Sequence, residues 1–280
     1  MNASSQMKTP EIPFLISPFD TAYLPQLEKL PPEEWQSNAY ELFLHYDWQP
    51  WFLAYQCIVN EQLAGFGMLM IFDEFAWFGW ILVAPPFRRK GLGTAITQRL
   101  IDEATSRGAK GLILTATEMG KPVYEKFGFT IDSSYLAFSL PHNYHPTFKK
   151  ERIRRATSND LEIICDLDQQ ATGEQRKELI KGRLDDCFVY DDQKIEGFYM
   201  PSLGNGFIVA CHKEAGITLL NYRCTTDKRA IVVPEQNLDI VDYMRKKHFT
   251  EGFAIPRMTL GKRPDWRPSM IFSRAAGYLG

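Results

Sequence analysis

A short basic loop with two glycines is the first stretch of the sequence whose residue types could do chemistry. It reads Arg88-Arg89-Lys90-Gly91-Leu92-Gly93-Thr94 and follows an apolar run, Trp80–Val83, which indicates a buried strand. After the loop, apolar residues recur at helical spacing from Ile96 to Ala104. The first amides of a helix have no internal partner, and glycine lets a ligand approach the backbone closely. The order of strand, glycine turn and helix start therefore predicts a site for phosphate or another anion.

A second stretch, Tyr124-Glu125-Lys126-Phe127-Gly128-Phe129, makes this prediction more specific. The loop alone is a weak motif, because it has neither the three-glycine spacing of a dinucleotide-binding turn nor the G-K-S/T of a Walker loop. The two stretches together resemble the GNAT N-acetyltransferase superfamily, whose signature is a strand, Q/R-x-x-G-x-G/A at a helix start, and a short helix ending in Y-E-K-x-G-F. Arg88, Gly91 and Gly93 match the loop, and Tyr124 to Phe129 match the second motif.

The resemblance implies acetyl-CoA as the co-substrate, no metal, and a set of site residues. The loop would bind the cofactor through Arg88, Arg89, Lys90, Gly91, Leu92, Gly93 and Thr94. Backbone amides near Leu82 and Val83 would bind the pantetheine arm and face the thioester oxygen. Tyr124 would be the general acid that protonates the departing thiolate, since a phenol with a pKa of about 10 stays protonated at neutral pH. The competing interpretation is that Tyr124 only packs on the cofactor.

The sequence leaves the general base open. Many members of the family have a glutamate on the central strand, but Trp77–Val83 contains no acid. The candidates are Glu118, Asp73 or Glu74, or an ordered water. Glu118 could equally be an acid that favours the start of the next helix. Thr117 also stands where many relatives have an asparagine, so coenzyme A contacts there do not follow from the resemblance.

The elements that would position these residues form an α/β fold of the α+β type. Strands are predicted at 14–16, 52–59, 63–72, 75–83, 111–114 and 135–140, and helices from Asp20 to about Leu30, from Pro32 to Leu44, after Gly93 and over 122–127. The strands between 52 and 83 would form an antiparallel meander. Gly111–Leu114 would lie parallel to Trp80–Val83, because a helix that Gly108 ends connects them.

The second part of the chain repeats the first. Asn60–Met68 aligns with Asp192–Met200 without a gap, and Phe129–Leu140 aligns with Phe249–Leu260, in the same order. Proline and histidine in 141–150 indicate a linker. Bacterial tandem-GNAT proteins resemble this arrangement. We therefore expect two tandem GNAT-like domains, each a mixed, mostly antiparallel sheet flanked by helices: a catalytic domain at 1–140 and a second domain at 151–280.

The second domain lacks the residues for the chemistry. No R-x-x-G-x-G occurs between Met200 and Leu219, and Met244 stands where the first domain has Tyr124. We therefore interpret 151–280 as a degenerate GNAT-like domain with a substrate or packing role. We expect it to pack against the first domain and to contribute side chains to the acceptor pocket.

Composition excludes several other classes of function. The 280 residues have a formal net charge of −2, so no bulk field would attract nucleic acid or an acidic membrane. No apolar run is long enough for a membrane span, and the N-terminus has no signal pattern. The five widely spaced cysteines indicate reduced thiols and hence a cytoplasmic protein.

The leading hypothesis is an acetyl-CoA-dependent N-acetyltransferase that acts on the primary amine of a small molecule, as a monomer or homodimer. One alternative is a coenzyme A-binding sensor or scaffold without turnover, which the intact loop would also fit. Another is a protein N-acetyltransferase, which would need an open groove for its acceptor.

Overall fold

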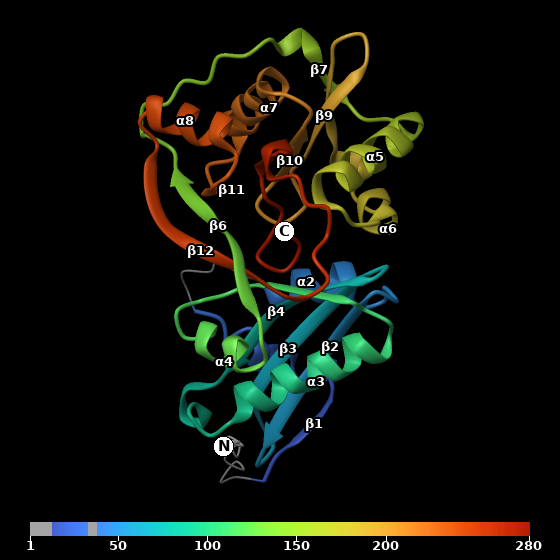
Figure 1. Ribbon diagram of the computed structural model, residues 1–280, viewed down its shortest axis with the longest axis vertical. Coiled ribbons are helices and arrows are strands. Elements are labelled where there is room, and N and C mark those ends of the chain that lie inside the picture. The colour runs from blue at the N-terminus through green and yellow to red at the C-terminus, as the bar shows by residue number, and fades with distance from the viewer. Residues whose placement is uncertain (1–12, 33–37) are drawn as a thin grey trace, which may run out of the picture. The chain divides into compact units, whose positions relative to one another are not determined.

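The computed structural model describes residues 13–32 and 38–280, and these form two compact units (Figure 1). The first unit comprises the described residues up to Leu112 together with Met119–Gly128. The second unit comprises Ile113–Glu118 and Phe129–Gly280. The strand β5, Gly111–Thr115, contributes its first two residues to the first unit and the rest to the second.

An antiparallel meander forms the sheet of the first unit. Its strands pair in chain order: β1 (Leu15–Pro18), β2 (Phe52–Val59), β3 (Gln62–Phe72) and β4 (Phe75–Val83). The turn between β2 and β3 places Asn60 and Glu61 at positive φ, and Asp73 does the same between β3 and β4. Asparagine and aspartate tolerate this conformation better than most residues do. The predicted meander is confirmed.

Two short helical segments lie between β1 and β2. Asp20 caps a 3-10 turn at Thr21–Tyr23 through the Ala22 amide, and α1 (Leu24–Leu27) follows, so the helix ends before the predicted Leu30. Pro32 is not helical, and residues 33–37 lie outside the described residues. The helix α2 (Ala39–Tyr46) begins after Asn38, whose side chain accepts from the Glu41 amide. An asparagine cap thus sets the described start.

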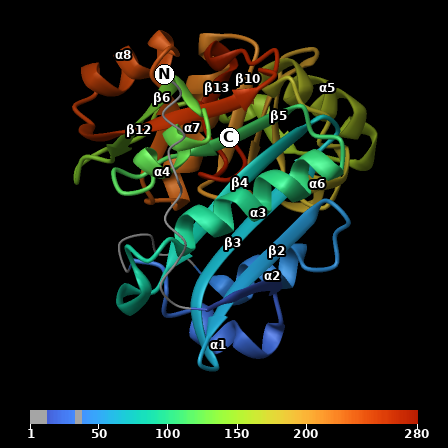
Figure 2. The same ribbon diagram turned by 60° about the horizontal axis from the view of Figure 1, so that its bottom comes forward.

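The helix α3 (Leu92–Ser106) packs across the meander and ends before Gly108, which has the expected positive φ of 89° (Figure 2). Two glycines on β3 let it come close. A Cβ built on Gly65 would be 2.7 Å from Ile96 Cδ1, and one built on Gly67 would be 2.5 Å from Ile96 Cγ2. The helix α4 (Lys121–Lys126) belongs to the same unit.

The second unit contains a five-stranded antiparallel sheet in the order β13-β10-β9-β8-β7. Its strands are β7 (Ile153–Arg155), β8 (Phe188–Asp191), β9 (Ile195–Met200), β10 (Phe207–Ala210) and β13 (Ile271–Ser273). Its helices are α5 (Leu161–Thr172), α6 (Lys177–Lys181), α7 (Lys213–Thr226) and α8 (Leu238–Lys246).

A second set of strands in this unit includes β6 (Thr130–Ser139), which precedes the linker. It pairs antiparallel with β11 (Ile231–Pro234) on one side and with β12 (Thr250–Gly261) on the other. Phe138 lies in the same buried cluster as Ile231 and Phe249. The first compact unit therefore stops at Gly128, whereas the sequence places this strand in a domain that extends to 140.

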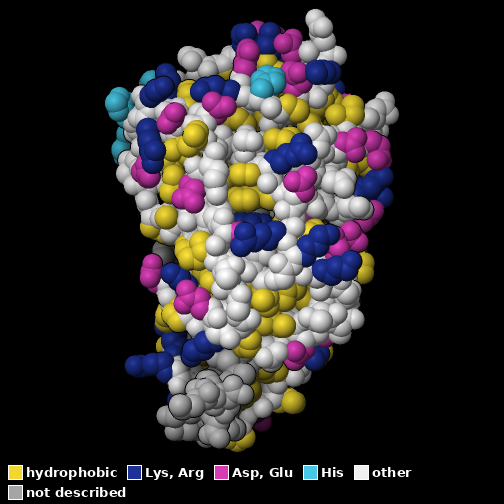
Figure 3. Space-filling view, in the orientation of Figure 1, with side chains coloured by type: hydrophobic (Ala, Val, Ile, Leu, Met, Phe, Trp, Pro, Cys, Tyr) yellow, Lys and Arg dark blue, Asp and Glu magenta, His cyan; other side chains and the backbone are white. Residues whose placement is uncertain are grey.

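The surface shows both signs of charge. On the face drawn in Figure 3, Lys and Arg side chains alternate with Asp and Glu side chains, in keeping with the net charge of −2. Within the described residues, no helix combines the length and apolarity that a membrane crossing requires. The same residues contain no group of three or more His, Cys, Asp or Glu side chains that could hold a metal ion.

Candidate active site

A bulge interrupts β4 just before its end. Phe66 pairs with Leu82, but Met68 pairs with Gly79, so Trp80 and Ile81 together face a single residue of β3. Trp80 has a φ of 47°, which is unusual for an aromatic residue. A bulge of this kind bends the strand and redirects its backbone groups. The sequence places the amides that would bind the pantetheine arm near Leu82 and Val83, but it did not lead us to predict the bulge beside them. An isolated glycine in a strand, here Gly79, is a signal for a β-bulge.

The basic loop after β4 is braced by its own first arginine. Nε of Arg88 donates a hydrogen bond of 3.0 Å to the carbonyl of Val83, so this side chain fixes the loop against the strand end. Arg89 and Gly91 both have positive φ, at 61° and 84°. Lys90 Nζ lies 5.9 Å from the centre of the Phe87 ring. The loop thus places three cationic side chains within a few residues of the start of α3.

The first backbone amides of α3 have no hydrogen-bond acceptor within the helix. Gly91 is its N-cap, and within the described chain no side chain caps this end. The first intrahelical bond is from the Ala95 amide to the Gly91 carbonyl, at 3.0 Å. The amides of Leu92, Gly93 and Thr94 precede it and can find no partner inside the helix. Leu92 is buried and anchors the turn, so these amides are held in place.

Gly93 is a glycine that the fold does not require but that a ligand would. A Cβ built there would meet Val83 Cγ2 at 3.6 Å, which is ordinary van der Waals contact. The fold would accept alanine at this position, whereas the positive φ of Gly91 requires glycine. Uncapped amides, three nearby cations and the open side of Gly93 fit a diphosphate. The residues that the sequence predicted for the pyrophosphate of coenzyme A therefore suit that group.

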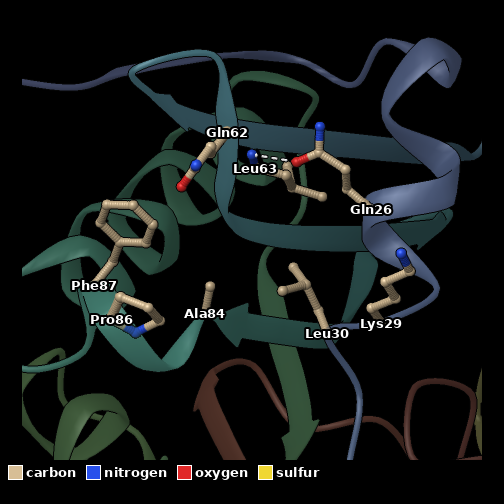
Figure 4. A pocket seen from close by; sticks show the side chains of 8 residues that line it. All are labelled: Gln26, Lys29, Leu30, Gln62, Leu63, Ala84, Pro86 and Phe87. Atoms are coloured by element: carbon tan, nitrogen blue, oxygen red, sulfur yellow. Dashed lines mark hydrogen bonds between the residues drawn. The ribbon is translucent and has the colours of Figure 1, made fainter.

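A hollow of about 390 Å³ adjoins the loop (Figure 4). Its walls come from α1 and the residues after it, the start of β3 and the segment after β4: Gln26, Lys29, Leu30, Gln62, Leu63, Ala84, Pro86 and Phe87. The Leu63 amide donates to Gln26 Oε1 at 2.9 Å and fixes one wall. Most of the lining residues are apolar, and Gln26, Lys29 and Gln62 supply the polar groups.

Tyr124 lies on α4 and is 8% exposed. Burial raises its pKa to about 12, so the phenol holds its proton firmly. Its ring lies directly over Gly120, where an added Cβ would be 2.8 Å from Cε2 and 3.1 Å from the hydroxyl oxygen. The glycine before the helix therefore makes room for the tyrosine ring. A phenol in a fixed position that stays protonated can serve as a general acid, and the raised pKa makes it a weaker acid than an ordinary tyrosine.

The candidates for the base differ in their surroundings. Glu74 Oε2 forms an ion pair of 3.0 Å with Lys110 Nζ, so its charge already has a partner. Asp73 is exposed in the turn between β3 and β4. Glu118 is exposed as well, and it belongs to the second compact unit. None of the three is buried beside Tyr124 or the loop in a way that favours it over water.

The second unit differs from the first at the equivalent place. Residues 84–91 separate β4 from α3, whereas only Cys211 and His212 separate β10 from α7. His212 caps α7 through its ring Nδ1, which accepts from the Ala215 amide at 3.4 Å. A two-residue link leaves no room for a phosphate loop, and the helix start already has a side-chain cap.

The strand β13 fills the space beside β10. Ile208 pairs with Ser273 there, and the Arg274 amide donates to the Val232 carbonyl on β11 at 2.8 Å. Phe272 packs so closely on α7 that a Cβ built on Gly216 would lie 2.4 Å from its ring. The C-terminal strand thus occupies the region between β10, β11 and α7.

Comparison with known proteins assigns the family of both halves. Residues 21–129 match the Acetyltransferase (GNAT) family, and residues 164–273 match the Acetyltransferase (GNAT) domain. Holothin acyltransferase from Pseudoalteromonas sp. is 23% identical over 255 residues, which cover 86% of this chain and 84% of that protein. The ribosomal protein bS18 alanine N-acetyltransferase of Escherichia coli is 32% identical over 100 residues, which cover 34% of this chain and 63% of the relative.

Solved structures show the same fold over the whole length. A crystal structure described as an acetyltransferase from Pyrococcus horikoshii has a TM-score of 0.81 at 19% identity, covering 100% of this chain and 99% of that one. A tandem GNAT protein from the clavulanic acid biosynthesis pathway has a TM-score of 0.62 at 13% identity, covering 89% and 98%. The two family matches in succession, on this fold, show that the chain belongs to the GNAT acetyltransferase family and contains two GNAT domains in tandem.

Proposed function

We propose that this GNAT acetyltransferase transfers an acetyl group from acetyl-CoA to the primary amine of a small molecule, at a site in the first unit. The family uses acetyl-CoA as its co-substrate. The observation that supports the site most directly is the start of α3, where uncapped amides, Gly93 and the basic loop meet. In the second unit, the short link, the His212 cap and β13 argue against a second cofactor site.

The loop, the start of α3 and the β4 bulge would then each have a defined role in binding acetyl-CoA. When bound, acetyl-CoA supplies a thioester that an amine can attack. The amides of Leu92, Gly93 and Thr94, with Arg89 and Lys90, would hold its diphosphate. Backbone amides at the β4 bulge, around Leu82 and Val83, would stabilise negative charge on the thioester oxygen.

Proton movements would use one protein group and the solvent. Tyr124 would give its proton to the departing thiolate, since a pKa of about 12 keeps the phenol protonated at neutral pH. The attacking amine would lose its proton to ordered water, or to Glu118 or Asp73. The pairing of Glu74 with Lys110 makes Glu74 the weakest of the three acids as a base.

The choice of a small-molecule acceptor rests on which relatives match which part of the chain. The relative that matches along most of the length is named for holothin. The relative named for an alanine of ribosomal protein bS18 matches only 100 residues, or 34% of this chain. A protein acceptor is therefore the second candidate. The contribution of the second domain to acceptor binding stays a prediction.

Gly93→Ala tests the cofactor site, because the fold accepts the methyl group and a diphosphate would not. We expect acetyl-CoA to bind about 10- to 100-fold more weakly, from the loss of charged hydrogen bonds. The melting temperature without ligand should stay the same. Isothermal titration calorimetry and thermal unfolding measure the two quantities. Gly252→Ala in the second unit serves as the matched control, because an added Cβ there also makes only ordinary contacts, at 3.5 and 3.8 Å from Ala137. Unchanged affinity in Gly93→Ala would place the cofactor elsewhere.

An acceptor panel separates the candidate activities. Free thiol is measured with small primary amines, with peptides that begin with alanine, and with no acceptor. Acetylated small amines, identified by mass spectrometry, are the expected product. A preference for the peptides would favour a protein N-acetyltransferase. Coenzyme A binding with no acetylated product from any acceptor would favour the sensor.

A further inference from the structure

One buried arginine of the second unit lacks the partner that comparable arginines have. Three other buried arginines form ion pairs: Arg176 with Asp168, Arg223 with Asp227, and Arg257 with Asp132. Arg274, just after β13, is 7% exposed. Its Nε and Nη1 are closed off from solvent without a hydrogen-bond partner, and no carboxylate of the described residues forms an ion pair with it.

An aromatic ring is the main neighbour of this guanidinium. Cζ of Arg274 lies 4.7 Å from the centre of the Tyr135 ring, and the Trp266 ring lies 6.1 Å from that of Tyr135. The Tyr135 hydroxyl is buried and has no hydrogen-bond partner among the described groups. Burial lowers the pKa of Arg274 to about 10, so the group is still a cation at neutral pH. A ring face offsets only part of the cost of taking a cation out of water.

The remaining nitrogen of Arg274, Nη2, faces a glycine. A Cβ built on Gly277 would be 3.8 Å from Nη2 and 2.8 Å from Thr115 Oγ1. Thr115 Oγ1 donates to the Gly277 carbonyl at 2.9 Å, which fixes the glycine in this position. Both Gly277 and Thr115 are partly exposed. A small anion that approaches Nη2 would therefore meet a guanidinium beside a residue that has no side chain.

We propose that Arg274 binds the carboxylate of a small organic acid, beside Gly277 and Thr115. One guanidinium balances one negative charge, which suits a carboxylate better than a phosphate dianion. Nη2 is the nitrogen that can donate to the carboxylate, because Nε and Nη1 are closed off from solvent. The cost of the unpaired cation would be recovered when the acid binds.

Phenylacetate and phenylacetamide, which differ in the charge alone, test this on the unaltered protein. Thermal unfolding in rising concentrations of each compound is the measurement. We expect phenylacetate to raise the melting temperature in a saturable way, because a ligand that binds the folded state stabilises it. The amide should have no effect. Equal effects of the two compounds, or none from the acid, would overturn the proposal.

Arg274→Met distinguishes a ligand site from a structural arginine. Replacing an unpaired buried charge with an apolar side chain should raise the melting temperature of the ligand-free protein. The affinity for phenylacetate should fall by about 10- to 100-fold. Arg267→Met, at an exposed arginine of the same segment, should change neither quantity. A lower melting temperature in Arg274→Met, or an unchanged response to phenylacetate, would show that Arg274 is structural.

The acid is either a separate ligand or the acceptor of the acetyl group. A second experiment distinguishes these two possibilities. This experiment rests on the proposed function. Thiol release is measured with L-phenylalanine and L-phenylalaninamide as acceptors. A preference for the acid that Arg274→Met removes would identify the carboxylate as part of the acceptor. Equal use of both acceptors, with the melting response to phenylacetate intact, would identify a separate acid. If no amine is acetylated, the proposed function fails and the melting result still stands.

Discussion

At the scale of single residues, the distinction that matters is between groups the fold requires and groups only a ligand requires. Gly91 has a positive φ and serves the turn itself, whereas Gly93 has room for a methyl group. Arg88 braces the loop through Val83, so part of its role is structural. The sequence predicted all of these residues as one cofactor motif. Their separate roles depend on backbone angles and contacts, which residue type and spacing do not contain.

Tyr124→Phe tests the general acid. The change removes the proton donor and keeps the ring, so acetyl-CoA affinity should stay the same while kcat falls by about ten- to a thousandfold. Steady-state kinetics and calorimetry separate the two quantities. Unchanged kcat would mean that water protonates the thiolate and that Tyr124 only packs. Gly120→Ala offers a second variant: its methyl group would displace the ring, so kcat should fall there too.

The pH dependence of kcat follows from the raised pKa of Tyr124. A general acid works while it is protonated, and its activity declines as pH rises through its pKa. Burial raises the pKa of Tyr124 to about 12, so its activity as an acid should decline only as pH approaches 12. A tyrosine with an ordinary pKa of about 10 would cause the decline near pH 10. We expect no decline due to Tyr124 near pH 10. A profile of kcat against pH that turns down near pH 10 in the wild type but not in Tyr124→Phe would show that the pKa of Tyr124 is not raised, although Tyr124 would still be the acid.

At the scale of elements, the sequence predicted the strands of the meander and the position of α3 well, because long apolar periods determine them. The bulge in β4 was not predicted. Its central residue is a tryptophan at a φ of 47°, and aromatic residues rarely occupy that conformation, so residue type pointed away from it. The sequence also predicts a helix that starts at Pro32, whereas α2 begins after the Asn38 cap, because a proline favours a helix start without determining it.

The close approach of α3 to β3 can be tested with a double-mutant cycle. Gly67→Ala should destabilise the protein by about 1–3 kcal/mol, because the new methyl group would collide with Ile96. Ile96→Ala alone should cost about 2–5 kcal/mol through the cavity it leaves. Together they should cost less than the sum, by about 0.5–3 kcal/mol, since the small side chain accommodates the methyl group. Urea unfolding measures all three variants. Strict additivity would mean that the two residues do not meet.

At the scale of the whole molecule, the internal repeat predicted two domains of one kind, and the family matches confirm this. The repeat did not predict that β6 pairs with β11 and β12. Every strand of a sheet offers the same backbone donors and acceptors, so the order of strands along the chain does not determine which of them pair. The partner of β6 depends instead on which apolar residues it buries, such as Phe138 in the core of the second unit.

The number of acetyl-CoA molecules that one chain binds follows from the difference between its two domains. The first unit has an uncapped helix start and a loop of residues 84–91, whereas the second has a two-residue link, a His212 cap and β13 in place. We therefore expect calorimetry to give one acetyl-CoA per chain. Gly93→Ala should weaken this single event, and His212→Ala, which removes the cap of α7, should leave its affinity and stoichiometry unchanged. Two binding events, or loss of binding in His212→Ala, would show that the second unit binds the cofactor. A single event that responds to Gly93 alone would mean that the second domain keeps the GNAT fold without its cofactor site, because its own C-terminal strand takes up that space.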